Sequence, residues 1–249
     1  MQVPSTQDLL AAWERGRADP RLTSRALELL STAYADIPRG ALAQLSIGER
    51  DRLLLSLREQ LFGSRFAAVT VCPQCGARLE MEFDAESICT ASQPGDETRD
   101  TEPLRLHHAD YAVRFRLPNG LDLASLPPAA PPDQSRRLLA ERLVLHAAHG
   151  DHEIGAQDLP EDVLRALDAR LAEADPQGEV QLNLVCAECR REWQAVFDIV
   201  SFLWSEVDAW ALRLLRDVHE LARAYSWREA DILALSPWRR QCYLELLGE

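Results

Sequence analysis

Hydrophobic residues recur at helical spacing through the first 66 residues. The first stretch begins after Ser5, which has Asp8 three residues later, and the last begins after Ser46, which has Glu49 three residues later. A serine followed by an acidic residue at this spacing is typical of a helix N-terminus. The sequence therefore predicts a helical N-terminal region whose last helix ends at Gly63, a residue type common at helix C-termini.

Two later stretches are apolar and strand-like, and each leads into a C-x-x-C pair followed by a second strand-like run. The cysteines are Cys72, Cys75, Cys186 and Cys189. A constant offset of 114 residues aligns the two stretches beyond the cysteines, for example Phe83 with Phe197 and Asp84 with Asp198. The pattern predicts two similar hairpins that are distant in sequence.

The insert between these hairpins mixes strand and helix patterns. Tyr111, Val113 and Phe115 alternate with other residues as in a strand with one buried face. Four prolines between 127 and 132 indicate a stiff connection. Helices are expected over residues 133–149 and 161–174.

The end of the chain is again helical. A single apolar stripe predicts a long helix from Ile199 to Tyr225. Ser226 with Glu229 resembles a capping box for a short helix, and Ser236 followed by proline is expected to start a last one. Five of the six tryptophans lie after residue 190.

Together these elements predict an α+β fold that is predominantly helical and carries a small split zinc ribbon. The expected division is a helical region (1–66), a first ribbon half (67–90), an insert (91–178), a second ribbon half (179–198) and a C-terminal helical region (199–249).

Two hairpins that each present two thiolates from a tight turn supply the four sulfur ligands of a tetrahedral zinc ion. Gly76 follows the first pair, at a place that often requires a positive φ. Arg190 occupies the equivalent place after the second pair. A closed shell of four cysteines leaves no position open for substrate, so the predicted Zn²⁺ is structural.

Other interpretations of the cysteines and histidines are weaker. A redox C-x-x-C pair starts a helix, whereas these pairs lie between strands. Disulfides need an oxidising compartment, and the N-terminus has no signal-peptide pattern. Cys89 and Cys242 are expected to be buried small residues. The group of His146, His149 and His152 is interpreted as solvated side chains near a helix end. The pair His107–His108 has no carboxylate or cysteine at ligand spacing and is not interpreted as a metal site.

Composition limits the function. The chain has 249 residues, 47% of them hydrophobic, and a net charge of −13. No run approaches the roughly 18 apolar residues of a membrane span, so a soluble, cytoplasmic protein is expected. An acidic chain is repelled by phosphate unless its basic residues gather on one side. Protein partners are therefore favoured over nucleic acid.

One part of the tail carries a family resemblance. The segments concerned are Asp208–Trp210, His219–Ala222, Tyr225–Leu235, Arg239–Arg240 and Tyr243–Leu244. They resemble the baseplate assembly proteins, also called hub assembly chaperones, of contractile-tailed phages. The larger form encoded in phage-tail-like contractile injection clusters, with two C-x-x-C pairs around an insert, is similar over most of this chain.

The resemblance implies a non-enzymatic protein that helps to assemble or cap a baseplate or hub in the cytoplasm of the producing cell. It leaves open whether the protein is released from the finished particle or retained in it. Its partners would be baseplate, hub or spike proteins. The proposed contact residues are Trp227, Ile232, Trp238 and Tyr243. The alternative is a zinc-ribbon adaptor for nucleic acid or the transcription machinery. An enzyme is disfavoured because the sequence has no H-E-x-x-H, G-x-S-x-G or P-loop motif.

Overall fold

The computed structural model describes residues 2–89 and 102–247. The chain divides into two compact units: residues 1–36 with 199–249, and residues 37–198. No described helix is both long enough and apolar enough to cross a membrane. The expectation of an α+β, mainly helical fold with two cysteine-bearing hairpins is confirmed.

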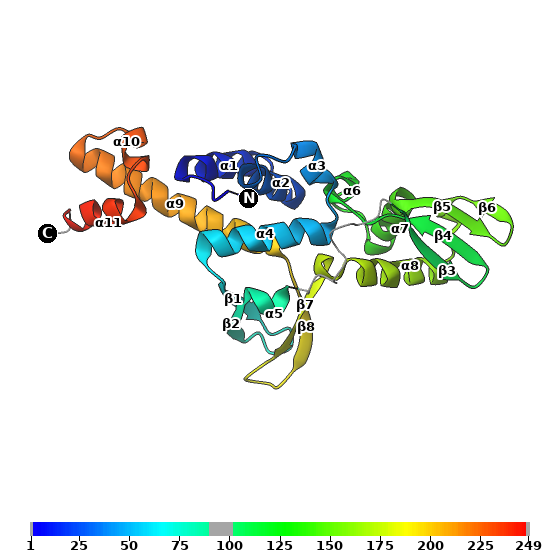
Figure 1. Cartoon of the computed structure of the whole chain (residues 1–249). Coiled ribbons are helices and arrows are strands. Elements are labelled where there is room, and N and C mark those ends of the chain that lie inside the picture. Colours follow the sequence, from blue (N-terminus) through cyan, green and yellow to red (C-terminus); the bar gives the residue numbers. More distant parts are fainter. Residues whose placement is uncertain (1, 90–101, 248–249) are drawn as a thin grey trace. The chain divides into compact units, whose positions relative to one another are not determined.

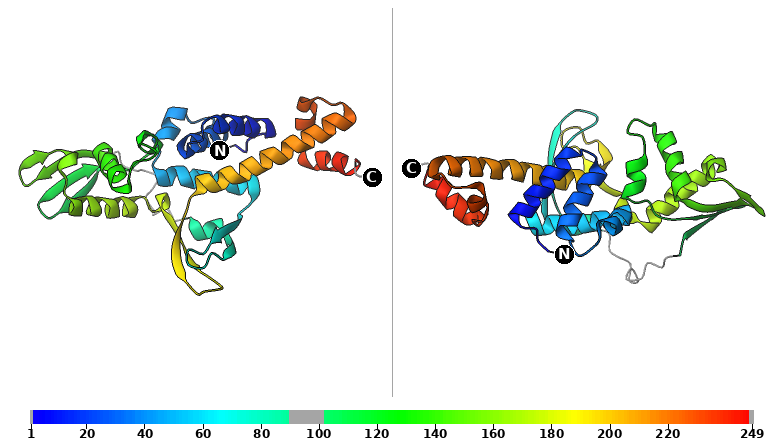
Figure 2. Two further views of the ribbon diagram at one scale, coloured as in Figure 1. Left: turned by 180° about the vertical axis from the view of Figure 1, so that it is seen from behind. Right: turned by 90° about the horizontal axis from the view of Figure 1, so that it is seen from above.

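The first unit is entirely helical among its described residues. Its elements are α1 (Thr6–Ala18), α2 (Leu22–Ala33), α9 (Ile199–Tyr225), α10 (Glu229–Leu233) and α11 (Pro237–Glu245). The long helix α9 carries α10 and α11 folded back at its C-terminal end (Figure 2). Near its N-terminal end, the indole of Trp204 lies against Gly16 of α1, where a Cβ atom would come within 2.3 Å of the ring.

The predictions of where the tail helices begin and end are partly correct. α9 has the expected bounds, and Ser236 accepts a hydrogen bond from the Arg239 N–H at the start of α11. The capping box at Ser226 is wrong. Ser226 adopts a left-handed conformation (φ 55°) and its N–H closes the last turn of α9, so α10 instead starts after Arg228, which makes no side-chain cap.

The second unit contains all of the described strands. Its helices are α3 (Arg39–Gln44), α4 (Ile47–Phe62), α5 (Ala85–Ile88), α6 (Gly120–Ser125), α7 (Pro132–Leu143) and α8 (Glu161–Ala174), with short 3₁₀ turns η2 (Ala156–Asp158) and η3 (Pro176–Gly178). Its strands are β1 (Arg65–Val71), β2 (Arg78–Asp84), β3 (Leu104–His108), β4 (Tyr111–Phe115), β5 (Val144–His149), β6 (His152–Ile154), β7 (Val180–Val185) and β8 (Glu192–Phe197). The capping box predicted at the start of α4 is present.

A four-stranded antiparallel sheet, β3-β4-β5-β6, forms the body of the insert (Figure 1). Its core packs Val113 and Phe115 of β4 against Ala140 of α7 and Val163 and Leu167 of α8. The sheet meets these helices through one face, as expected from the alternation along β4.

The helix predicted over residues 133–149 is wrong in its second half. α7 ends at Leu143, and β5 follows directly. Ala147 of β5 pairs with Val113 and is buried in the insert core, so long-range strand pairing overrides the local helical propensity. The side chain of Asn119 caps α6 by accepting hydrogen bonds from the N–H groups of Leu121 and Asp122.

Candidate metal centre

The two hairpins that carry the cysteines have the same strand register. In the first, Phe66 pairs with Phe83 and Val71 with Arg78. Adding 114 to each number gives pairs found in the second hairpin, Val180 with Phe197 and Val185 with Glu192. The sequence repeat is therefore also a structural repeat, as predicted.

The turns between the strands are built alike. In the first, the Gly76 N–H donates to the Cys72 carbonyl (3.0 Å), and the Cys72 N–H donates to the carbonyl of residue 77 (2.9 Å). The second turn repeats this pattern, with the Arg190 N–H donating to the Cys186 carbonyl (3.0 Å). Gly76 has φ 73° and Arg190 has φ 62°. The positive φ expected after the first pair is present in both copies, although only one has a glycine.

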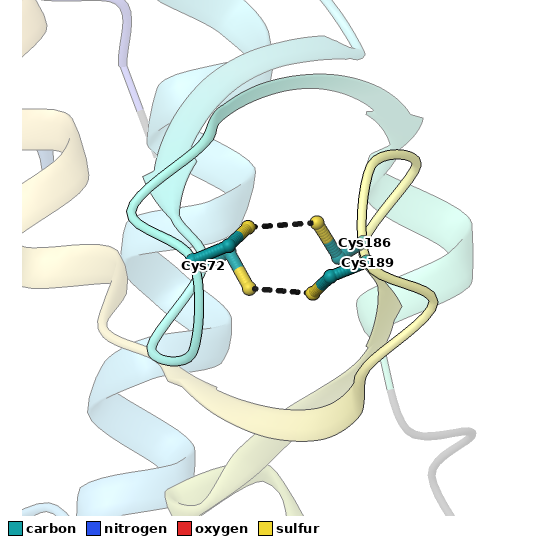
Figure 3. Close-up of side chains that lie close together, drawn as sticks. Cys72, Cys186 and Cys189 are labelled. Atoms are coloured by element: carbon teal, nitrogen blue, oxygen red, sulfur yellow. Dashed lines mark hydrogen bonds between the residues drawn. The ribbon is translucent and has the colours of Figure 1, made fainter.

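The four cysteine sulfurs converge on one point. Cys72 and Cys189 have sulfurs 3.6 Å apart, as do Cys75 and Cys186, and all four sulfurs lie within 4.8 Å of one another. Figure 3 shows the side chains of Cys72, Cys186 and Cys189 pointing toward this point from opposite hairpins. All four thiols are free, and their separation is far from the roughly 2.05 Å of a disulfide.

The donor set fits a tetrahedral metal ion. Four sulfurs bound at about 2.3 Å to one Zn²⁺ would be separated by about 3.8 Å, close to the cross-hairpin distances. Cys72 and Cys186 are buried, so the protein shields these two sulfurs of the cluster from solvent. The cluster can therefore hold a metal ion with its protein ligands alone.

The pKa values of Cys72 and Cys75 reflect the backbone N–H groups around them and how closely the thiols are packed. The backbone N–H of Cys75, with that of Gln74, outweighs burial and lowers the pKa of Cys72 to about 6. At Cys75 the N–H of Ala77 favours the thiolate, but burial and the neighbouring thiols prevail and raise the pKa to about 12. Four thiols this close ionise together only when a cation compensates their charge.

A cluster of phenylalanines joins the hairpins at the end away from the sulfurs. Phe66 stacks on Phe83 (5.1 Å between ring centroids), and Phe197 meets both edge-on at 5.8 and 5.6 Å. The guanidinium of Arg58 lies 3.9 Å from the Phe66 ring centroid. The two hairpins thus contact each other through the thiols at one end and aromatic rings at the other.

Buried polar contacts fix the chain just before the second hairpin. Asp175 accepts a hydrogen bond of 2.8 Å from the Gly48 N–H at the start of α4. A Cβ atom on Gly48 would lie 1.9 Å from that carboxylate, so the contact needs glycine. Gln177 donates to the carbonyl of Ile88 (3.1 Å), which links η3 to the end of the first hairpin segment.

The other predicted residues have different surroundings. Cys89 is exposed and Cys242 half-buried, so the prediction of burial is wrong for Cys89, where Ile88 takes the buried position at the end of α5. The histidines lie on the β5–β6 hairpin and not at a helix end: His149 pairs with His152.

The predicted partner residues lie in the tail. Tyr225, Trp227 and Tyr243 form an aromatic cluster with ring centroids 4.8 to 5.8 Å apart. Ile232 is fully buried, whereas Trp238 is 75% exposed. Trp238 therefore offers the largest accessible surface of the four proposed contact residues.

Comparison with known proteins adds one finding. A family model described as "T4 bacteriophage base plate protein" matches residues 2–204, a stretch that includes all four clustered cysteines. Nothing matches among the curated proteins or the solved structures. The match ends at Trp204, ahead of most of α9 and of the tail helices.

Proposed function

The chain belongs to the T4 bacteriophage base plate protein family, and we propose on this premise that it is a non-enzymatic assembly factor for the baseplate or hub of a contractile particle. Membership confirms the resemblance to phage baseplate proteins and supports a structural or assembly role. The particle is a contractile phage tail or a related injection system. The family match over residues 2–204 is the observation that carries the proposal.

The proposed role of the metal centre is structural. One Zn²⁺ bound by Cys72, Cys75, Cys186 and Cys189 would tie together hairpins more than 100 residues apart in sequence. It would fix the two ends of the insert without taking part in chemistry. The spacing of the sulfurs and the burial of Cys72 and Cys186 support this role.

The proposed docking surface is the tail formed by α10, α11 and the end of α9. Trp238 would insert into a partner subunit, while Trp227, Ile232 and Tyr243 support it from within the tail. An exposed tryptophan is a costly surface feature in a free protein and a frequent energetic centre of an interface. We propose that docking takes place in the cytoplasm of the producing cell, with retention in the particle as an alternative outcome.

Affinity purification tests the assembly role. The tagged chain, expressed at its native level with the genes that encode the particle, is expected to recover baseplate, hub or spike proteins. Recovery of none of them would count against the proposal.

A pair of variants tests the docking surface. Trp238→Ala is expected to reduce the yield of assembled particles while leaving the helix content of the purified chain unchanged, because the side chain is largely exposed. Leu212→Ala on α9, which removes another partly exposed apolar side chain, serves as the matched control. Normal assembly with both Trp227→Ala and Trp238→Ala in a folded chain would reject the assignment.

A further inference from the structure

A groove of about 440 Å³ lies between α9 and α11, within the helical unit. Three arginines and two carboxylates line it: Arg213, Arg216, Arg240, Asp217 and Glu220. The groove wall thus has one more positive than negative group, in a chain whose net charge is −13.

Arg240 is the unusual member of this set. It is only 4% exposed, and one of its terminal nitrogens donates to the carbonyl of Leu235 at 2.7 Å. Within the described part of the chain, its Nε atom has no hydrogen-bond partner. Burial lowers the pKa of Arg240, and the charge of Asp217 opposes that shift. A buried guanidinium with incomplete pairing is energetically costly unless further negative charge approaches it.

The two other arginines stand at the rim of the groove. Arg213 and Arg216 are exposed residues of α9, and both act electrostatically on Asp217. Their guanidinium groups offer planar donor pairs that match a carboxylate. Half-buried Trp210 and buried Leu214 also line the groove and provide apolar surface.

The charge of the tail differs from that of the rest of the chain. Residues 199–245, which span α9 to α11, contain six arginines and seven acidic residues, a net charge of −1, so the remaining residues carry −12. This segment also contains the exposed Trp238. The helices that the proposed function assigns to partner binding are therefore close to neutral, whereas the rest of the chain carries almost all of the net negative charge.

We propose that the α9–α11 groove binds an acidic segment of a partner protein, with its carboxylates on Arg213 and Arg216 and an apolar side chain over Trp210. This inference rests on the proposed function, whose partner it describes chemically. A polypeptide fits better than a nucleic acid. Asp217 and Glu220 in the groove wall, and the −12 charge outside α9 to α11, repel a continuous polyphosphate, whereas spaced carboxylates can avoid them.

The test uses the purified full-length chain and fluorescence anisotropy. The probe is a short labelled peptide of alternating glutamate and leucine, compared with its lysine counterpart and with a thymidine oligonucleotide of equal charge. The glutamate peptide is expected to bind most tightly and to weaken with added salt. Equal binding of the lysine peptide, or tighter binding of the oligonucleotide, would overturn the proposal.

Charge reversal locates the binding. The double variant Arg213→Glu, Arg216→Glu is expected to weaken peptide binding by roughly tenfold or more, because attraction becomes repulsion at the groove. The matched control is Arg105→Glu, Arg114→Glu, which makes the same charge change on a cross-strand pair of the β3–β4 sheet. Equal weakening by both double variants would refute a specific groove.

A milder substitution tests the groove with less risk of misfolding. Gln241 is exposed at the groove, and Gln241→Glu changes its charge without changing its size. It should weaken binding severalfold while the circular dichroism spectrum is unchanged, and unchanged affinity would contradict the proposal.

Particle assembly, measured separately, distinguishes the two proposals. If Trp238→Ala abolishes assembly but the unmodified chain binds no glutamate peptide, the groove proposal is rejected and the assembly role is retained. If the unmodified chain binds the glutamate peptide tightly but the Arg213→Glu, Arg216→Glu variant still assembles normally, the groove is supported and its use in assembly is rejected.

Discussion

Replacement of Cys186 by serine removes one of the four sulfurs and should release the connection between the two hairpins. Cys75 and Cys186 are 111 residues apart. By the chain-entropy model, a cross-link closing a loop of that length contributes about 5 kcal/mol to stability. All of this stabilisation depends on one metal site. The loss of one of its four ligands is therefore expected to remove most of the stabilisation.

Hydrogen exchange measures this effect where it occurs. A loss of about 5 kcal/mol corresponds to more than a thousandfold increase in the opening equilibrium. Peptides from β7 and β8 of the Cys186→Ser chain should therefore exchange much faster than those of the wild type. Peptides from α1 and α2, which belong to the other compact unit, provide an internal reference.

Two controls separate metal loss from a general effect of losing a thiol. Cys89→Ser changes an exposed cysteine outside the cluster and should leave exchange in β7 and β8 unchanged. A strong chelator should bring the wild type to the exchange rate of Cys186→Ser and have no further effect on the variant. Equal exchange in Cys186→Ser and Cys89→Ser, or no response of the wild type to the chelator, would refute the reasoning.

Three other substitutions test separate features, each by chemical denaturation. Arg190→Gly should stabilise the chain by about 1 kcal/mol, because Arg190 has a left-handed φ of 62°; a loss of stability would contradict the strained turn. Gly16→Ala should destabilise it by about 1–3 kcal/mol, because the new Cβ would lie 2.3 Å from the Trp204 ring, whereas Gly40→Ala, with nothing within 4 Å, should not. Equal effects of the two glycine changes would be inconsistent with that packing. Burial raises the pKa of Asp51 to about 6, so the folded state binds its proton more tightly than the unfolded chain, and wild-type stability should fall as pH rises from about 4 to above 6. Asp51→Asn should reduce this fall, to which Asp168 and Asp217 also contribute because burial raises their pKa values, and it should add roughly 2–3 kcal/mol near pH 7; a pH profile identical to that of the wild type would exclude Asp51 as a source.

The cysteine cluster could be predicted because its determinants are local and repeated. Each C-x-x-C pair lies in a turn between two short strands, and the second copy repeats the first at a constant offset. The bounds of α9 were predictable for a similar reason, since one continuous apolar stripe covers its whole length.

The features that sequence analysis missed depend on contacts between distant residues. The stretch 144–149 contains three helix-favouring residues, Leu145, Ala147 and Ala148, and becomes a strand only because β4 and β6 pair with it. Pairing of the Phe66 ring with Phe197 likewise requires the two hairpins to have met already.

Buried polar groups in the structure have no signal of their own in the sequence. Asp175 resembles any acidic residue before a proline, and Arg240 lies in an ordinary-looking Arg-Arg pair. Only packing buries them, at the start of α4 and beside the α9–α11 groove respectively. The groove could therefore not be predicted from the sequence.

X-ray absorption at the zinc edge, combined with elemental analysis of the freshly purified chain, tests the shared metal centre most directly. We predict one zinc ion per chain, surrounded by four sulfur atoms at about 2.3 Å. A content well below one metal ion per chain, or a shell with fewer than four sulfurs, would contradict the account of two hairpins joined at a single ion.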